Sequence, residues 1–394
     1  MTRLWDKGAP LDARVLRYTA GEDYALDERL VAYDVRASLA HAEMLHAQRL
    51  LSGEDLAALR AALEALGAEH ERGAWHIELE DEDGQTALER RLTARTGSAG
   101  ARIHLGRSRN DQVLTALRLY LRDAVAQLAA AARAGAQALR ALGTREADTP
   151  LPGYTHMQQA MPSSVRLWAE GFAAELDDDA AGLLAVQRRL GKSPLGSAAG
   201  YGTPGLPIDR EATRARLGFE TVHEPVTAVQ LSRGKAEAQL LCELALLQQD
   251  LSRFAADVLL FATSEFGFVT LAEAFTTGSS IMPQKRNPDL FELLRARAAT
   301  TQACLAEALA VCAKLPSGYQ RDLQLIKFPL FRAIDVVTDS LAILPDAVAA
   351  LAFRRDAIRL DPGIHAAEEA NRLVVSEGLP FREAYRRVAA KLKK

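Results

Sequence analysis

The sequence predicts an all-α protein, built as an elongated bundle of long helices with smaller helical domains at its ends. Alanine, leucine, arginine and glutamate favour helices, and they dominate the proline-free interval between Pro10 and Pro150. Apolar residues also recur at steps of three and four over long stretches, which indicates amphipathic helices. The 394 residues are enough to bury a large core between such helices.

The clearest helical pattern follows Asn110. Its apolar positions are Leu114, Leu117, Leu121, Val125, Leu128, Ala132, Leu139 and Leu142, with Gly135 in the missing place. They predict one helix over residues 111–142, which is longer than a small domain is wide. Such a helix needs partners along its length, either from the same chain or from another subunit.

Four more long helices are expected downstream, and together the five imply an extended bundle. Their patterns cover residues 162–189, 226–266, 288–315 and 334–353. The loops between elements, where function is expected, cover residues 101–110, 143–162, 191–210 and 267–287. We divide the chain into an N-terminal helical domain (1–105), a central long-helix bundle domain (106–353) and a shortened C-terminal helical domain (354–394).

Composition narrows the classes of function. A formal net charge of -3 lacks the basic excess that binding to a phosphate backbone usually needs, so we expect no nucleic-acid partner. The N-terminus lacks the apolar core of a signal peptide, and no run of about eighteen apolar residues occurs. We therefore expect no membrane association and a cytoplasmic location. Cys242, Cys304 and Cys312 lie in apolar helical runs without a CxxC pair, which indicates free buried thiols.

Two patterns that could suggest cofactor or metal sites have simpler interpretations. Residues 200–205 match GxGxxG, but no apolar strand precedes them, so we interpret them as a tight glycine turn. The eight histidines show no HExxH motif or close pairing, so zinc is not indicated. We expect neither a metal nor a cofactor.

The most informative segment is Gly-Ser-Ser-Ile-Met-Pro-Gln-Lys-Arg-Asn-Pro-Asp, residues 278–289. Gly278 and Ser279 are small enough to let backbone N–H groups approach an anion, and Lys285 adds a positive charge. Asn287 and Pro288 suit the N-cap and the first turn of the next helix. The segment therefore suits a carboxylate substrate.

Two other polar segments allow two interpretations each. His156 lies in a polar loop beside hydroxyl side chains, where it could be catalytic or only structural. Residues 104–111 gather two arginines and Asn110 at a helix start. They could serve as an N-cap made by Asn110, or as a clamp for a carboxylate.

Taken together, these segments resemble the fumarase and aspartase superfamily, and within it the argininosuccinate lyases, over essentially the whole chain. Gly-Arg-Ser-Arg-Asn-Asp-Gln (106–112), Pro-Gly-Tyr-Thr-His (152–156) and Met-Pro-Gln-Lys-Arg-Asn-Pro-Asp (282–289) are similar to that family's three shared regions, in the same order. Residues 319–327 are similar to the segment that holds the arginine part of the substrate.

The resemblance implies a β-elimination that splits argininosuccinate into arginine and fumarate. It also implies a homotetramer with a central twenty-helix bundle and active sites that are each shared by three subunits. Ser279 would be the base, with Lys285 and Asn287 binding carboxylate oxygens, while His156 paired with Glu292 would assist proton return. The implied catalytic residues are Ser279, His156, Glu292, Lys285 and Thr155. The implied substrate-binding residues are Ser108, Arg109, Asn110, Gln85, Arg233, Asn287, Tyr319, Gln324 and Lys327.

The chain departs from the family pattern at several positions. Gln85 stands where relatives commonly have histidine, Leu105 replaces a threonine, and Leu325 and Ile326 replace acidic residues. The chain also stops at Lys394, whereas relatives usually continue further. Two alternatives therefore accompany an active argininosuccinate lyase. One is a carbon-nitrogen lyase that releases fumarate from another N-substituted aspartate, and the other is a catalytically weak homologue like the delta-crystallins.

Overall fold

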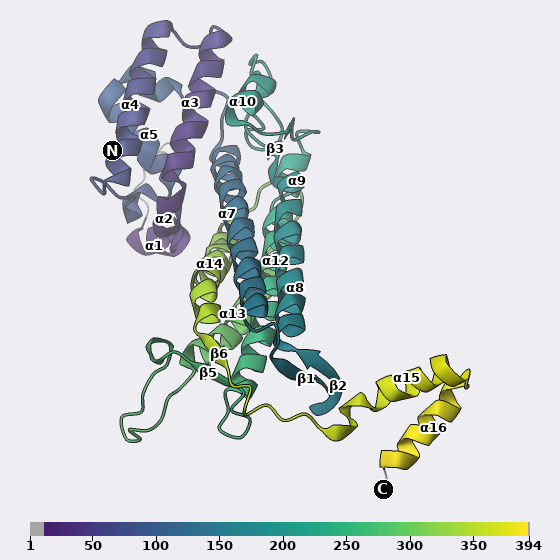
Figure 1. The fold of residues 1–394 in the computed structure, drawn as a ribbon. Helices are drawn as coiled ribbons and strands as arrows, with labels where there is room; N and C mark the ends of the chain where they lie inside the picture. Colours follow the sequence, from purple (N-terminus) through teal and green to yellow (C-terminus); the bar gives the residue numbers. More distant parts are fainter. Residues whose placement is uncertain (1–11, 393–394) are drawn as a thin grey trace. The chain divides into compact units, whose positions relative to one another are not determined.

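The computed structural model describes residues 12–392, and its helices confirm the all-α prediction (Figure 1). The helices before residue 220 are α1 (Ala13–Ala20), α2 (Asp23–Leu26), α3 (Val31–Ala47), α4 (Gly53–Glu71), α5 (Gly84–Thr96), α6 (Ser98–Arg102), α7 (Arg109–Arg145), α8 (Val165–Ala185), α9 (Gln187–Leu190) and α10 (Arg210–Leu217). The later helices are α11 (Ala228–Leu231), α12 (Lys235–Phe261), α13 (Asp289–Cys312), α14 (Lys327–Ala349), α15 (Ala366–Glu377) and α16 (Phe381–Leu392). Short 3-10 turns include η1 (Asp27–Leu30) and η4 (Arg321–Ile326).

The chain divides into two compact units. The first unit is Met1–Leu128, Gly182–Ala245 and Thr300–Val336, and the second is Ala129–Ala181, Leu246–Ala299 and Val337–Lys394. Each of the long helices α7, α8, α12, α13 and α14 contributes residues to both units. The division into three sequence-based domains stays a prediction.

A leucine-rich core holds together the N-terminal helices of the first unit. Leu45 on α3, Leu63 on α4 and Leu92 on α5 are almost fully buried in one cluster. The helix starts are capped, because Ser52 accepts the Asp55 N–H at 3.0 Å and Asp83 accepts the Thr86 N–H at 2.8 Å. The cap on Asp83 fixes the residues at the start of α5, which line the pocket described below.

An aromatic cluster forms much of the core of the second unit. The Trp168 ring on α8 stacks on Phe254 of α12 at 5.4 Å between centroids, and its Nε1 donates to Asp257 at 2.9 Å. Gly135 on α7 allows close helix packing, since a Cβ there would lie 2.6 Å from a methyl carbon of Leu344 on α14. The missing place in the apolar pattern of α7 therefore has a steric cause.

Two of the five predicted long helices match the structure closely. The helix expected over 111–142 is α7, and the helix expected over 288–315 is α13. Three predictions need correction. The helix expected over 162–189 begins only at Val165, and α9 follows its end at Ala185 as a separate turn. The helix expected over 334–353 begins earlier, at Lys327, and ends at Ala349.

The stretch expected to form one helix over 226–266 is broken at Gly234 into α11 and α12. Gly234 has a φ of 84°, which is outside the helical region and favours glycine. A Cβ at this position would lie 2.2 Å from the Cys312 sulfur, so the break also lets the backbone approach α13 closely.

Small two-stranded sheets occur between the helices, and the sequence predicted none of them. Strands β1 (Pro150–Thr155) and β2 (Gln158–Ser164) form an antiparallel hairpin within the loop predicted over 143–162 (Figure 1). β5 (Val269–Leu271) pairs with β6 (Leu351–Phe353), and β3 (Lys192–Ser193) pairs with β4 (Thr221–Val222). As predicted, residues 200–205 form turns, and Gly200, Gly202 and Gly205 there have positive φ.

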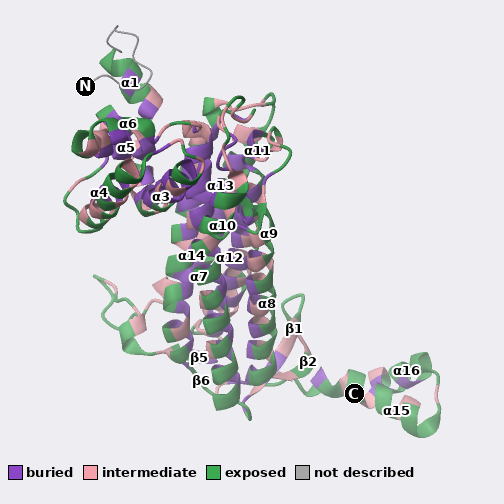
Figure 2. Cartoon of the chain, turned by 90° about the horizontal axis from the view of Figure 1, so that it is seen from above, coloured by how far each residue is buried: buried purple, intermediate pink, exposed green. Residues whose placement is uncertain are grey.

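The last helices, α15 and α16, pack on each other through a small cluster that includes Ala370, Ala384 and Val388. Most of their remaining surface is exposed (Figure 2).

The three cysteines are free, as predicted, but the expectation that all are buried is wrong. Cys304 is buried, whereas Cys242 lies on an exposed face of α12.

Over residues 12–392, none of the helices combines the length and the apolar character needed to cross a bilayer. The first eleven residues, on which the expectation of no signal peptide rests, lie outside the described residues.

Candidate functional site

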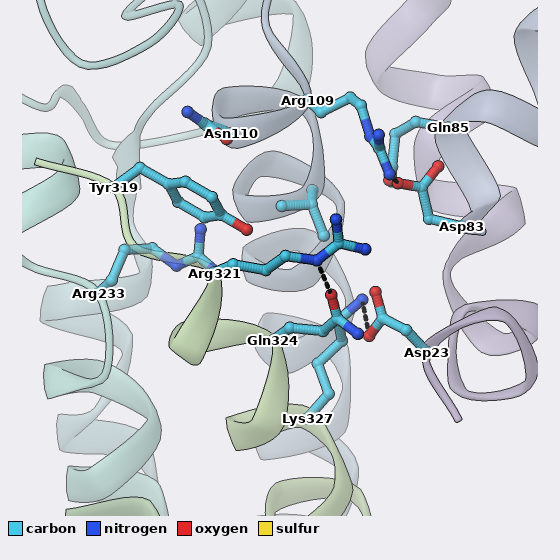
Figure 3. Close-up of a pocket in the computed structure, with 11 residues that line it drawn as sticks. Asp23, Asp83, Gln85, Arg109, Asn110, Arg233, Tyr319, Arg321, Gln324 and Lys327 are labelled. Carbon is cyan, nitrogen blue, oxygen red and sulfur yellow. Dashed lines mark hydrogen bonds and ion pairs between the residues drawn. The ribbon is translucent and has the colours of Figure 1, made fainter. Parts of the chain in front are cut away.

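A polar pocket of about 150 Å³ lies within the first unit (Figure 3). Its lining comes from α2, from the α5 and α7 starts, and from the segments around residues 233 and 319–327. The lining residues are Asp23, Asp83, Gln85, Arg109, Asn110, Val113, Arg233, Tyr319, Arg321, Gln324 and Lys327. Four cationic and two acidic side chains therefore face a small volume, which suits a ligand rich in carboxylates.

The pocket brings together seven of the nine residues predicted to bind substrate. They are Gln85, Arg109, Asn110, Arg233, Tyr319, Gln324 and Lys327. Ser108 lies next to the pocket at the start of α7, and Asn287 belongs to the loop of the second unit. The sequence analysis did not predict Asp23, Asp83 and Val113, and it included Arg321 only as part of the segment 319–327.

Ser108 and Asp111 organise the start of α7. The Ser108 N–H donates to Asp111 Oδ1 at 2.9 Å, and the Asn110 N–H donates to Ser108 Oγ at 3.3 Å. Asp111 Oδ2 also accepts the N–H groups of Gly196 and Ala198, at 2.9 and 2.8 Å. Ser108 therefore provides the capping side chain, and the interpretation of Asn110 as the N-cap is wrong. Among the described residues the Asn110 side chain makes no hydrogen bond, so its amide is available at the pocket.

At one end of the pocket, Lys327 is held by two carboxylates. Its Nζ lies 2.7 Å from Asp23 Oδ1 and 2.5 Å from Asp27 Oδ1, and all three residues are buried. Burial alone would lower the pKa of Lys327, but the two carboxylates outweigh it and raise this pKa. Lys327 is therefore a permanent cation. Burial raises the pKa of Asp23 to about 7, against the opposing effect of Lys327.

Gln324 and Arg321 fasten η4 to the N-terminal segment. Gln324 Nε2 donates to the carbonyl groups of Thr19 and Ala20 at 3.0 and 3.1 Å, and its Oε1 accepts from Arg321 Nε at 3.2 Å. Arg321 also donates to the Thr19 carbonyl at 2.9 Å. Both ends of the Gln324 amide are thus engaged inside the protein, which fixes its position at the pocket wall.

The wall formed by α5 holds a buried acid. Gln85 Nε2 donates to Asp34 Oδ2 at 2.7 Å, and both side chains are buried. Burial raises the pKa of Asp34 to about 8, and the nearby carboxylates of Asp27 and Asp83 add to the effect of burial. Asp34 therefore carries a proton at neutral pH. On the same wall, Arg109 pairs with Asp83.

Arg233 is the pocket cation that makes no ion pair in the part of the chain that the structure describes. It is only 8% exposed, and its Nε and Nη1 atoms have no hydrogen-bond partner among the described residues. Its guanidinium carbon lies 5.7 Å from the centroid of the Tyr319 ring. Leaving buried donors unpaired is costly, so Arg233 is well placed to receive an anionic group of a ligand.

The loop around Ser279 belongs to the second unit. Ser279 Oγ accepts the N–H groups of Ile281 and Met282, at 3.3 and 3.1 Å. Reciprocal backbone hydrogen bonds between Thr277 and Asn287, at 3.1 and 2.8 Å, close the base of the loop. Lys285 is exposed on this loop and makes no ion pair within the described residues. Two amide dipoles therefore point at the Ser279 oxygen, an arrangement that favours negative charge there.

Asn287 does not cap α13, contrary to the prediction. The carbonyl group of Pro288 accepts the N–H groups of Phe291 and Glu292, at 3.0 and 3.3 Å, so Pro288 is in the N-cap position. The Asn287 side chain instead donates weakly to Gly278 and Thr277 across the loop base, at 3.4 and 3.5 Å.

His156 lies at the tip of the β1–β2 hairpin. Thr155 pairs with Gln158, which leaves His156 and Met157 as a two-residue turn with positive φ values of 53° and 61°. Glycine and asparagine are usual in such turns, and other residues there cost about 1–2 kcal/mol each. The backbone thus holds an exposed imidazole outward at some energetic cost, as functional sites often do.

The predicted pairing of His156 with Glu292 is not made within a single chain. Both side chains are exposed, and they share no hydrogen bond or ion pair in the described residues. Whether they pair between subunits stays a prediction.

Leu105, where a threonine was expected, is partly exposed, and its carbonyl group interacts with His41 at 2.8 Å. Over residues 12–392, no group of histidine, cysteine, aspartate or glutamate side chains could hold a metal ion.

Comparisons with known proteins agree on one family. A family model described as Lyase matches residues 12–302. The chain is 50% identical to an argininosuccinate lyase of Sorangium cellulosum over 99% of this chain and 90% of that protein. It is 42% identical to an argininosuccinate lyase of Stenotrophomonas maltophilia over 98% of this chain and 90% of that protein.

Solved structures agree on the fold. An EDDS lyase in complex with formate has a TM-score of 0.79 and 25% identity, covering 97% of this chain and 76% of that one. A class II fumarase of Schistosoma mansoni has a TM-score of 0.81 and 18% identity, covering 98% and 91%. The chain therefore belongs to the argininosuccinate lyase family of the fumarase and aspartase superfamily.

Proposed function

We propose that this protein catalyses the β-elimination of argininosuccinate to arginine and fumarate. The observation that carries the proposal is the near-full-length identity of 50% to a relative named argininosuccinate lyase. The pocket supports it, because argininosuccinate is rich in carboxylates and the pocket offers an unpaired buried arginine beside an available amide.

We assign the base to Ser279. A serine hydroxyl is normally too weak an acid to exist as an alkoxide at neutral pH, so the loop must stabilise the charge. The two N–H groups that point at Ser279 Oγ and the positive charge of Lys285 would supply that stabilisation. The alkoxide removes the proton from the carbon beside a carboxylate, the carbon-nitrogen bond breaks, and the nitrogen leaves with the arginine.

Different pocket residues would bind the succinyl part and the arginine part of the substrate. Arg233 and Asn110, with Ser108 and Thr155, would hold carboxylates of the succinyl part. Tyr319, Gln324 and Lys327 would hold the arginine part, and Arg109 and Gln85 would shape the wall between them. Lys285 and Asn287 would bind the carboxylate that accepts the charge of the carbanion, and His156 with Glu292 would return a proton.

We also propose a homotetramer in which three subunits share each active site. His156 supports this, because its strained hairpin tip presents the imidazole outward and the imidazole has no partner among residues 12–392. Apolar side chains are also exposed on the long helices, and where such side chains lie together in one patch they mark an interface with another protein. Examples are Leu167, Leu246, Leu293 and Leu309. The cytoplasmic location stays a prediction.

A panel of N-substituted aspartates tests the proposed reaction. We expect argininosuccinate to give the highest kcat/KM, measured by the ultraviolet absorbance of fumarate, with adenylosuccinate and ethylenediamine disuccinate as competitors. A higher kcat/KM for another panel member would favour the related lyase, because Leu325 and Ile326 replace expected acidic residues. If the folded protein releases no fumarate from any of these substrates, the catalytically weak homologue would be favoured.

A further inference from the structure

The β1–β2 hairpin carries His156 at its tip and is anchored in the second unit at its base. Leu151 on β1 is almost fully buried, and the Val165 N–H donates to the Thr149 carbonyl group at 3.1 Å where β2 leads into α8. A two-stranded hairpin is only marginally stable by itself in water. The tip therefore needs a further contact if His156 is to stay in one position.

Gln159, the second residue of β2, makes such a contact. Its Nε2 donates to the carbonyl group of Arg359 at 2.8 Å, and its Oε1 accepts the N–H of Asp361 at 2.8 Å. Both ends of the amide thus bind the backbone of one segment, which lies just before the 3-10 turn η5 (Pro362–His365). We call these two hydrogen bonds the Gln159 brace.

The segment that receives the brace is itself held in place. Ile358 and Ile364, on either side of it, are both buried. Asp361 Oδ1 accepts the Gly363 N–H at 2.6 Å and caps η5, which is in contact with β2 (Figure 1). The brace therefore joins the hairpin to a fixed part of the same unit.

The neighbours of Gln159 hold the tip less firmly. Gln158, the preceding residue, donates to the carbonyl group of Met157 at 3.1 Å, which lies within the turn itself. Tyr154, opposite Gln159 on β1, contacts the Phe266 ring edge-on at 6.3 Å between centroids. Hydrogen bonds weaken steeply as their angle departs from linearity, so the brace defines the position of the tip more narrowly than a ring contact does.

We propose that Gln159 is a positioning residue, which fastens the hairpin tip to residues 359–361 and thereby holds His156 in place for proton return. The inference rests on the proposed function, because it needs the role proposed there for His156. Proton transfer requires heavy atoms within about 2.6–3.2 Å of each other. A displacement of about 1 Å can lower a rate by about a hundredfold. Backbone atoms of the C-terminal segment thus contribute to catalysis through Gln159.

The variant Gln159→Leu tests the brace, because leucine is of similar size and makes neither hydrogen bond. We expect kcat to fall by about tenfold to a hundredfold, with KM changed by less than about threefold, measured by fumarate absorbance. Gln187→Leu is the control, since it removes a comparable hydrogen bond, from Gln187 Nε2 to the Arg122 carbonyl group at 2.9 Å, in the first unit. Its kcat should stay close to that of wild type. Equal losses of kcat in both variants would refute the positioning role.

Two variants of Asp361 test the other side of the brace. Asp361 has φ −61° and ψ 132°, which proline also adopts, so Asp361→Pro removes the N–H that Gln159 accepts without changing φ. Asp361→Ala keeps this N–H, and both variants lose the cap on Gly363. Asp361→Pro should therefore have the lower kcat, by at least about threefold. Equal kcat values for the two variants would show that Gln159 does not act through this segment, and the proposal would fail.

Amide hydrogen exchange, followed by mass spectrometry, separates this inference from the proposed function. In Gln159→Leu, peptides that cover residues 154–158 should exchange at least about fivefold faster than in wild type, and those that cover residues 163–166 should not change. Unchanged exchange at the tip, or faster exchange with unchanged kcat, would overturn the inference and leave the reaction standing. Faster exchange in a protein whose wild type releases no fumarate would overturn the proposed function and leave the brace standing.

Discussion

The pocket of the first unit and the loop of the second unit hold their polar residues in opposite ways. In the pocket, Lys327 and Gln85 are engaged by buried carboxyl groups of the same unit, and Gln324 donates to the carbonyl group of the buried Ala20. On the loop, Ser279 receives only backbone N–H groups, and Lys285 is exposed without an ion pair in the described residues. The residues proposed to recognise substrate are thus fixed by the fold of one chain, whereas those proposed to move protons are not.

This difference suggests that the pocket selects the ligand and that the loop carries out the proton transfers. A preorganised pocket loses little entropy when it binds, and its buried charges select the ligand. A half-buried serine and an exposed lysine and histidine gain their full effect only when water is excluded around them. We infer that substrate and neighbouring subunits complete the surroundings of the loop.

The largest expected effect is that of Ser279→Ala. Loss of the base should lower kcat by about a hundredfold to ten-thousandfold, measured by fumarate absorbance. Ser280→Ala is the matched control, because Ser280 is an exposed neighbour whose side chain makes no hydrogen bond in the described residues. Tm should not change in either variant. Comparable activity of Ser279→Ala and Ser280→Ala would refute the assignment of the base.

Subunit mixing tests whether other subunits complete the loop. Ser279→Ala and His156→Asn proteins should each be inactive alone. After joint denaturation and reassembly in equal amounts, about a quarter of the sites should combine an intact Ser279 with an intact His156 from another subunit. Activity should recover to about that fraction. No recovery from tetramers shown to contain both variants would count against shared sites.

Asp27→Asn should measure how firmly the pocket is held. Without the Asp27 carboxylate, Lys327 keeps only Asp23 as a buried ion-pair partner. The free energy of unfolding, measured in urea, should therefore fall by about 3 kcal/mol. Asp335→Asn is the control, because Asp335 pairs with Arg29 at 3.0 Å on the exposed surface. That change should cost about 1 kcal/mol or less. Equal costs would contradict the view that the pocket depends on buried charge.

Asp34 should make stability depend on pH. Its pKa is raised from 3.8 to about 8 by burial, so the folded protein keeps a proton that the unfolded chain has lost between these values. The free energy of unfolding should therefore fall as pH rises from about 4 to 8, by about 1 kcal/mol per pH unit from this residue. Asp34→Asn removes the contribution.

Urea titrations of the wild-type protein and of Asp34→Asn at pH 5 and pH 8 isolate the effect of Asp34. The contributions of the other titratable groups cancel when the two free energies of unfolding are subtracted at each pH. Asp34→Asn should gain stability relative to wild type as pH rises. A difference that stays constant across this range would show that Asp34 is ionised in the folded protein.

The sequence predicted the long helices best where an apolar period extends along the whole helix, with Gly135 as a single gap in α7. α7 and α13 follow such periods. The break at Gly234 was missed because one glycine in an apolar run does not reveal the approach of Cys312. The β1–β2 hairpin was missed because Pro150, Pro152 and Pro162 argue against strands, although a two-stranded hairpin leaves outward-facing N–H positions where proline fits.

The site was predictable where a local motif marks it, as around Ser279, Asn110 and Tyr319. Asp23 was missed because its significance depends on Lys327, which lies some three hundred positions further along the chain. The cap was assigned wrongly at Asn110 because Ser108, two residues earlier, also has a suitable side chain. It was assigned wrongly at Asn287 because the N-cap position falls on Pro288, which has no capping side chain. Only the backbone geometry decides which residue takes the N-cap position.

The products of the reaction test the central claim most directly. Proton nuclear magnetic resonance should show one equivalent of fumarate and one of arginine formed together from argininosuccinate, with no added metal or cofactor. Aspartate and citrulline, the products of hydrolysis on the other side of the same nitrogen, would contradict an elimination, and so would an unchanged substrate in the presence of the folded protein.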